Sequence, residues 1–172
     1  ASLVMVLAVY PHHLLMDFVM PTWMLVMGQI VSYLSGLPVL VVTALGVLIN
    51  VSRSGIRWDM TSGLLFLAVV GWSIGVIPAI VDGTIVVNAV MHNTLWVPGH
   101  FHTYLLLGQV TMVFGFMYYV AAKPGSGADI ALDRIGFWVF AVASLGFSAT
   151  FLYAGRASVP RRFAEHLPEW TS

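Results

Sequence analysis

Residues 83–122 read GTIVVNAVMHNTLWVPGHFHTYLLLGQVTMVFGFMYYVAA, a stretch of forty residues that contains no Asp, Glu, Lys or Arg. A single helix of that length would measure about 60 Å, twice the roughly 30 Å thickness of the hydrocarbon core of a bilayer. We therefore expect one membrane-spanning helix over residues 95–121, preceded by an interfacial loop that runs through His92.

The other long uncharged stretches of the chain have the same character. They cover residues 18–52, 60–81 and 135–155, and each reaches the length of about 20 residues that a spanning helix needs. They predict spanning helices over residues 21–51, 61–81 and 135–155, besides a partial helix at the N-terminus. Pro38 is expected to kink the first of these three. The predicted fold class is all-α: a polytopic transmembrane helix bundle, with residues 1–172 forming a single transmembrane region.

The overall composition agrees with this prediction and excludes several classes of function. The chain is 59% hydrophobic and 8% charged, whereas soluble domains usually have about 25% charged residues. Its seven basic and seven acidic residues cancel, so no electrostatic argument supports a nucleic-acid partner. Because the chain has no cysteine, it cannot form disulfides, thiolate metal sites or iron–sulfur clusters. The sequence describes an integral membrane protein with membrane lipids as neighbours.

The segment HNTLWVPGHFH, residues 92–102, holds three of the six histidines. An imidazole in lipid costs free energy unless something binds it. On an α-helix, His100 and His102 point about 200° apart, so they cannot share one metal ion but can bind two groups on opposite sides. For a lone histidine, a hydrogen bond to a neighbouring helix is an equally good explanation. For this pair, ligation of haem iron, zinc or copper is favoured.

Two further motifs fall on the same predicted side of the membrane. YPHH, residues 10–13, offers His12 and His13, which at a helix end can converge on one metal ion if a third ligand comes from elsewhere. SVPRRF, residues 158–163, offers Arg161 and Arg162. These arginines could be interfacial anchors that reach the lipid headgroups, or they could bind the buried carboxylates of a cofactor. Alternation of the helices puts all the histidines on this side.

Taken together, HNTLWVPGHFH, the HH pair before it and VPRR after it resemble subunit I of the haem–copper oxidases. The similarity is greatest to the B-type oxidases of bacteria and archaea, and it spans the chain from the end of family helix VII through helix XI. The resemblance implies part of the catalytic subunit of a respiratory terminal oxidase in the cell membrane. Such an enzyme reduces O2 to water at a haem–copper centre and couples this reaction to proton translocation.

The resemblance also implies roles for individual histidines. His12 and His13 correspond to the pair that binds the copper ion. His100 corresponds to the ligand of the high-spin haem iron, where O2 is reduced. His102 corresponds to one ligand of the low-spin haem iron. The catalytic residues implied in this way are His12, His13 and His100.

Three more residues are implied to contact the carboxylates of the haems. Arg161 and Arg162 correspond to the arginine pair that binds the haem propionates, and His92 corresponds to the loop histidine beside them. The implied partners are the remainder of subunit I, subunit II, and either cytochrome c or quinol as the electron donor.

The chain also departs from the family pattern. The second ligand of the low-spin haem, the third copper histidine and its partner tyrosine come from family helices that have no counterpart here. We therefore expect the chain to be a fragment or a split subunit that needs the rest of subunit I. Val39 and Val42 replace polar residues on a proton path, with Thr43 one position further on, and Asn88 stands where relatives can carry a carboxylate.

Two alternatives remain open from the sequence. A nitric oxide reductase of the same superfamily uses similar histidine clusters, with iron in place of copper. A non-catalytic haem-binding membrane subunit could keep the histidines and lose the substrate pathway, and Val39 and Val42 leave this alternative open.

Overall fold

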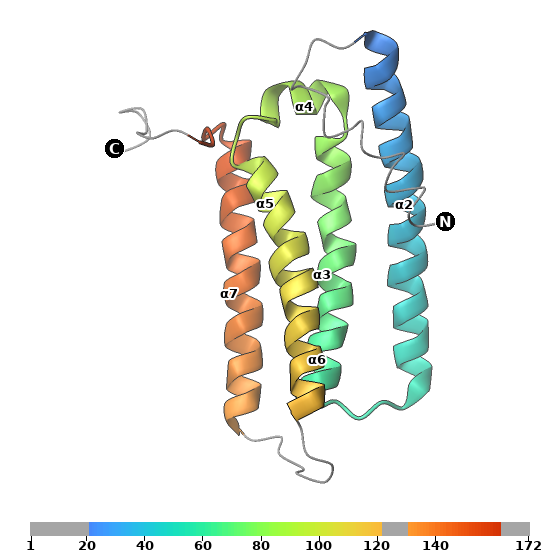
Figure 1. Ribbon diagram of the computed structural model, residues 1–172, viewed down its shortest axis with the longest axis vertical. Coiled ribbons are helices and arrows are strands. Elements are labelled where there is room, and N and C mark those ends of the chain that lie inside the picture. The colour runs from blue at the N-terminus through green and yellow to red at the C-terminus, as the bar shows by residue number, and fades with distance from the viewer. Residues whose placement is uncertain (1–20, 122–130, 163–172) are drawn as a thin grey trace.

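The structure, a computed structural model, describes residues 21–121 and 131–162. Four helices in these ranges are long and apolar enough to cross a membrane: α2 (Thr22–Ser54), α3 (Met60–Asp82), the segment Trp96–Ala121, and α7 (Ala131–Arg156). They stand side by side in Figure 1. The prediction of an all-α membrane-spanning bundle is confirmed, and each long helix begins and ends within a few residues of its predicted range. The predicted partial helix at the N-terminus lies outside the described residues.

The helix α2 contains Pro38 in its interior and continues through it, so the helix does not end there. It ends at the lower end of the bundle, where Gly55 takes the left-handed conformation with φ 61°. Glycine adopts this conformation without a steric penalty.

The third span differs from the regular helix that we expected. It consists of α5 (Trp96–His102), the π-helix η2 (Thr103–Val110) and α6 (Thr111–Ala121), which follow one another without a break. Within it the Thr111 hydroxyl donates to the carbonyl of Leu106, five residues earlier, at 2.7 Å. A hydroxyl that binds such a carbonyl helps to satisfy backbone groups released from the α-helical pattern. π-Helical segments are rare and are often found at functional sites.

The loop predicted to run through His92 is the second difference. Residues Ile85–Met91 form a short helix, α4, which lies across the upper end of the bundle in Figure 1. The expectation of a loop was wrong because this segment can satisfy its backbone groups as a helix while it lies flat on the bundle. Its Asn88 is buried, whereas Val86 and Val90 are largely exposed in this chain.

Glycines allow the helices to approach one another closely. Gly71 of α3 faces Leu107 of η2, and a Cβ atom at position 71 would lie 2.4 Å from the Leu107 side chain. Gly155 of α7 faces Trp96 of α5, where a Cβ atom would lie 2.0 Å from the Trp96 backbone nitrogen. Small residues at such contacts are typical of membrane helices, whose association depends on close van der Waals packing.

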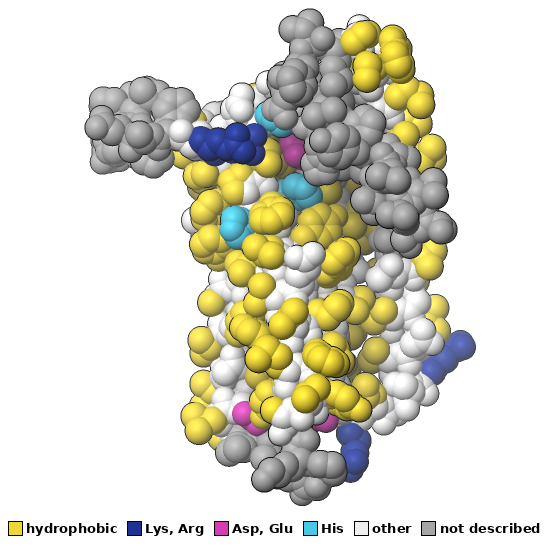
Figure 2. All heavy atoms as spheres, viewed as in Figure 1, with side chains coloured by type: hydrophobic (Ala, Val, Ile, Leu, Met, Phe, Trp, Pro, Cys, Tyr) yellow, Lys and Arg dark blue, Asp and Glu magenta, His cyan; other side chains and the backbone are white. Residues whose placement is uncertain are grey.

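The two ends of the bundle differ in their charged groups. In Figure 2 the histidines lie toward the upper end, with an acidic side chain between them and basic side chains beside them. The lower end carries the start of α3, where Asp59 and Ser62 form a capping box. The Ser62 N–H donates to Asp59 Oδ1 at 2.8 Å, and the Asp59 N–H donates to Ser62 Oγ at 2.9 Å. The hydrogen bond from the Ser62 backbone holds the pKa of Asp59 below its ordinary value.

Substitution of Gly155 by alanine tests the close contact of α5 and α7. The added methyl group would overlap the Trp96 backbone, and such overpacking typically costs about 1–3 kcal/mol. We expect G155A to lower the thermal unfolding temperature of the detergent-solubilised protein. The control is G146A on the same helix, where a Cβ atom meets nothing within 4 Å and little change is expected. Equal unfolding temperatures for the two variants would contradict the packing described here.

Substitution of Asp59 tests the capping box. We expect D59A to destabilise the protein by about 1 kcal/mol at pH 7, as loss of a helix N-cap usually does. Because the pKa of Asp59 is lowered on folding, its charge stabilises the protein at pH values above 3.8, the ordinary pKa of this group. This contribution is lost as the pH falls through the lower pKa of the folded state. D59N keeps the acceptor oxygen without the charge, so its unfolding temperature relative to D59A should not change over that pH range.

Candidate functional site

A cavity of about 480 Å³ opens near the upper end of the bundle. Segments that are distant in the sequence contribute its walls: the end of α3, then α4, α5 and the chain that follows α7. It is lined by Asp82, Asn88, His92, Leu95, Val97, Pro98, His100, Phe101, Arg161 and Arg162. Of the site residues predicted from the sequence, the structure brings His92, His100, Arg161 and Arg162 together here.

Backbone pairing holds the two arginines beside the histidine segment. The Arg161 N–H donates to the carbonyl of Asn93, and the Leu95 N–H donates to the carbonyl of Val159, both at 2.9 Å. Thr94 and Pro160 form an antiparallel bridge between these two bonds. The VPRR and HNTL segments, some sixty residues apart, therefore lie against each other as short extended pieces.

The chain turns sharply before and after this pairing. Ser158 has φ 64° and Arg162 has φ 65°. Residues other than glycine seldom adopt this left-handed conformation, which is uncommon enough to need support from surrounding contacts. The turn at Ser158 directs the chain from the end of α7 back over α5, and the second left-handed residue, Arg162, is itself a member of the arginine pair.

His100 lies in the wall of the cavity among apolar side chains. Its neighbours in that wall include Val97 and Phe101, and its ring makes an edge contact with Tyr104, with 5.2 Å between the ring centroids. An imidazole beside apolar side chains, in a cavity that two arginines also line, matches a flat apolar cofactor that bears carboxylates. His100, Arg161 and Arg162 are therefore the lining residues whose chemistry suits a haem.

His102 has different surroundings. It is not part of the cavity lining, and its ring packs against Phe147 and Phe151 of α7, at centroid distances of 5.2 and 5.7 Å. Its Nδ1 lies 2.6 Å from the carbonyl of Pro98. Because a carbonyl can only accept, Nδ1 carries the proton in this bond, which leaves the Nε2 lone pair for a metal ion. The two histidines thus serve different environments, as their helical spacing requires.

Asp82 is a member of the cavity that sequence reasoning did not single out. The buried amide of Asn88 donates through Nδ2 to the Asp82 carbonyl at 2.7 Å and to its carboxylate at 3.2 Å. The sequence drew attention to Asn88 only as a replacement for a carboxylate. The structure places the Asp82 carboxylate beside that amide, so the cavity still has an acidic wall. The signal in the sequence was the single charge that separates the uncharged stretches 60–81 and 83–122.

Other predicted site residues stay untested. His12 and His13 lie outside the described residues, as does the position of any copper ion between them. Within 21–121 and 131–162, no three His, Cys, Asp or Glu side chains come together in a way that could hold a metal ion. Val42 is 71% exposed on α2 in this chain.

The comparison with known families identifies the family of the chain. Residues 1–172 match the model of the family described as "Cytochrome C and Quinol oxidase polypeptide I". The chain belongs to this family. This oxidase subunit I chain is 31% identical over 113 residues to the cytochrome c oxidase subunit 1 of Thermus thermophilus. The alignment covers 61% of the chain and 20% of that relative.

Other relatives include both kinds of oxidase. The chain is 31% identical over 117 residues to the quinol oxidase subunit 1 of Bacillus subtilis, covering 59% of the chain and 17% of the relative. It is 26% identical over 117 residues to the cytochrome c oxidase polypeptide 1 of Halobacterium salinarum. This alignment covers 66% of the chain and 20% of the relative. The chain therefore spans about a fifth of the length of these curated relatives. No solved structure matches it significantly.

Replacement of Asn88 by leucine tests the Asn88–Asp82 contact. The substitution removes two hydrogen bonds from a side chain that is only 3% exposed, and loss of a buried partner typically costs about 1–3 kcal/mol. We expect N88L to lower the thermal unfolding temperature. V90A, on the same short helix at a residue that is 69% exposed, should change it little. If N88L behaved like V90A, Asn88 would not be a buried partner of Asp82.

Proposed function

We propose that this chain is part of the catalytic subunit of a B-type respiratory terminal oxidase. In this proposal, residues 1–172 form one transmembrane region that corresponds to family helices VII to XI. The complete enzyme reduces O2 to water at a haem–copper centre and couples the reaction to proton translocation. It lies in the cell membrane of a bacterium or archaeon. The observation that carries the proposal is the meeting of His100, Arg161 and Arg162 at one cavity.

In this proposal the residues that line the cavity have different roles. His100 would hold the iron of the high-spin haem from an apolar wall. When bound, the haem and copper supply the redox chemistry by which O2 is reduced. The apolar side chains around His100 exclude water and lower the local dielectric constant, which strengthens the interactions of any charge inside.

The arginines would hold the propionates of the haems. The guanidinium group of arginine binds carboxylates through paired, charge-assisted hydrogen bonds. The backbone pairing of Arg161 with Asn93 keeps the arginine pair at the cavity whatever its side-chain rotamers. His92 lies in the same lining and would contact the propionates as a polar neighbour.

His102 would ligate the low-spin haem on the other side of α5. Its Nδ1 bond to the Pro98 carbonyl orients the ring and selects the tautomer whose Nε2 can ligate iron. A single helix would thus stand between two haems and shorten the path for electrons between them. His12 and His13 would bind copper together with a third histidine from the remainder of subunit I.

The remaining partners follow from the same proposal. The remainder of subunit I would supply the missing ligands, and subunit II would complete the complex. The relatives include a cytochrome c oxidase and a quinol oxidase, so the donor is either cytochrome c or quinol.

The test uses the complete oxidase complex that contains this chain, purified from the membrane. We expect H100A to lower O2 uptake by at least about 100-fold, because loss of even an outer-shell partner of a metal ligand costs 10–100-fold. The spectrum of the high-spin haem should disappear while that of the low-spin haem remains. H102A should remove the low-spin spectrum. The control is S52A at the lower end of α2, where Ser52 bonds only within its own helix, and unchanged turnover is expected.

Metal analysis of the same preparation separates the alternatives. Copper together with haem iron is the expected result. Iron without copper would indicate the nitric oxide reductase alternative, and haem without O2 uptake in the unmodified complex would indicate a non-catalytic subunit. Turnover that survives in H100A would refute the assignment of His100.

A further inference from the structure

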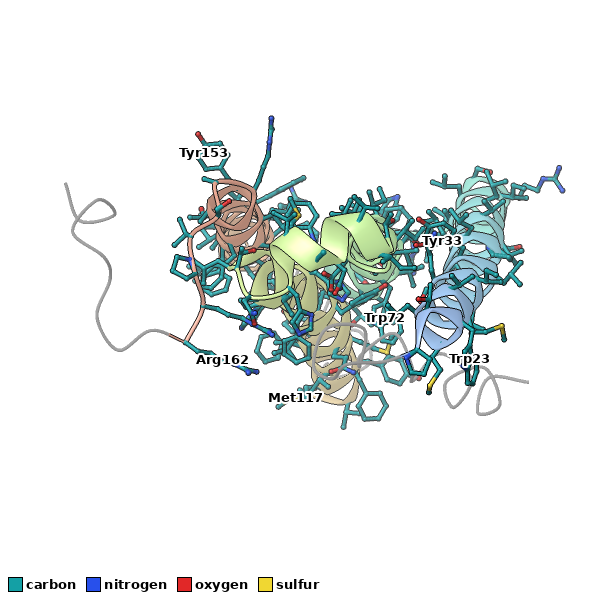
Figure 3. The ribbon with its side chains drawn as sticks, turned by 90° about the horizontal axis from the view of Figure 1, so that it is seen from above. Trp23, Tyr33, Trp72, Met117, Tyr153 and Arg162 are labelled. Carbon is teal, nitrogen blue, oxygen red and sulfur yellow. The ribbon has the colours of Figure 1, made fainter. Side chains whose placement is uncertain are left out.

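The short helix α4 is held at its start by side chains of α2. The Ile85 N–H donates to Gln29 Oε1 at 2.9 Å. The Tyr33 hydroxyl and Thr84 Oγ1 are 2.5 Å apart, and the Thr84 hydroxyl itself donates to the Ile80 carbonyl at 3.0 Å. Because the Thr84 hydrogen is used in that bond, Tyr33 is the donor to Thr84. In Figure 3, Tyr33 lies on the side of α2 that faces the rest of the bundle.

This contact replaces a cap that α4 does not supply for itself. The first N–H groups of any helix have no partner within the helix. Thr84 occupies the N-cap position but makes no side-chain capping bond to α4. At seven residues, α4 is also too short to be stable without tertiary contacts. Gln29, which precedes Ile85 by 56 residues, accepts one of the first N–H groups instead.

The contact is connected to the cavity through the backbone of α4. The Asn88 N–H donates to the Thr84 carbonyl at 2.7 Å, and the His92 N–H donates to the Asn88 carbonyl at 2.9 Å. Residues four apart lie on one face of a helix, so Thr84, Asn88 and His92 form one row. The start of this row is bound by α2, and the other two members line the cavity. A shift of the start of α4 is therefore transmitted to the cavity wall.

We propose that Gln29 and Tyr33 are positioning residues of the cavity that contains His100. Neither side chain is part of the cavity lining. They act by fixing the N-terminus of α4, and with it the places of Asn88 and His92 in the cavity wall. The inference rests on the proposed function only for the nature of the group in the cavity, because the hydrogen bonds between α2 and α4 are independent of it.

The experiment compares variants of α2 in the complete oxidase complex. Q29M removes the acceptor with little change of side-chain length, and Y33F removes one hydroxyl. The control is S35A on the same helix, whose hydroxyl donates only to the Ser32 carbonyl of α2, at 3.1 Å. Amide hydrogen exchange is measured over residues 85–92, and the midpoint potential and absorption spectrum of the high-spin haem are measured on the same samples.

We expect Q29M and Y33F to raise exchange over residues 85–92 about tenfold, roughly the effect of losing one net hydrogen bond. Exchange elsewhere in the complex and in S35A should stay unchanged. The midpoint potential of the haem should shift in both variants and not in S35A. Q29E, which keeps an acceptor oxygen, should restore the exchange rate of the Ile85 amide. In the double variant Q29M/Y33F, the loss of protection from exchange should be smaller than the sum of the losses in the two single variants, because both residues act on one helix end.

Each outcome decides a separate point. Unchanged exchange in Q29M and Y33F would refute the role of α2 in fixing α4. Faster exchange with an unaltered haem potential would refute the positioning of the cavity wall. If the unmodified complex contained no haem, the proposed function would be refuted. The exchange data would still test the contact between α2 and the start of α4. If Q29M did not assemble, Y33F and Q29E would decide the same question.

Discussion

The close packing of α5 against α7 is the constraint on which the rest of the site depends. At Gly155 there is no room for even one further carbon atom beside the Trp96 backbone, and Gly99 of α5 is similarly close to Leu152 of α7. In a membrane such contacts are among the few forces that hold helices together, because lipid tails are as apolar as the side chains they would replace. This contact sets the position of the helix that carries His100 and His102. It also brings the end of α7 to the start of α5.

The arrangement at the upper end follows from that contact. Once α7 ends beside α5, the chain after Ser158 can pair with the segment before Trp96, and the arginine pair comes to the cavity. The helix α4 closes the same end, with Asn88 bound to Asp82 and its N-terminus bound to α2. The backbone N–H groups of Ile85 and Arg161 and the Asn88 amide nitrogen are thus bound by residues from other segments, as polar groups at membrane depth require. At the lower end, a local capping box closes the start of α3, and the Tyr118 hydroxyl of α6 donates to the Asp133 carboxylate of α7.

The π-helical segment η2 separates the histidines from the rest of their span. It begins directly after His102 and contains Gly108, where a Cβ atom would lie 2.2 Å from the Trp72 indole. A wider helix with a glycine at this contact lets α3 approach closely, and the hydroxyls of Thr103 and Thr111 bind carbonyls of the same span. The uncharged stretch predicted a single spanning helix here, because a local change of hydrogen-bonding pattern leaves the hydrophobicity of the sequence nearly unaltered.

The sequence by itself determined the number and approximate limits of the spanning helices, because the cost of a charge in lipid marks their ends at residues such as Arg53 and Asp82. It also determined that His100 and His102 point in different directions from their helix, since that follows from helical geometry alone. Tertiary structure alone decided that Arg161 meets Asn93, that Asp82 meets Asn88, and that Gln29 caps α4. These contacts join residues whose spacing in the chain carries no periodic signal, and they arise only when packed helices bring their ends together. The copper histidines, His12 and His13, remain predictions from the sequence.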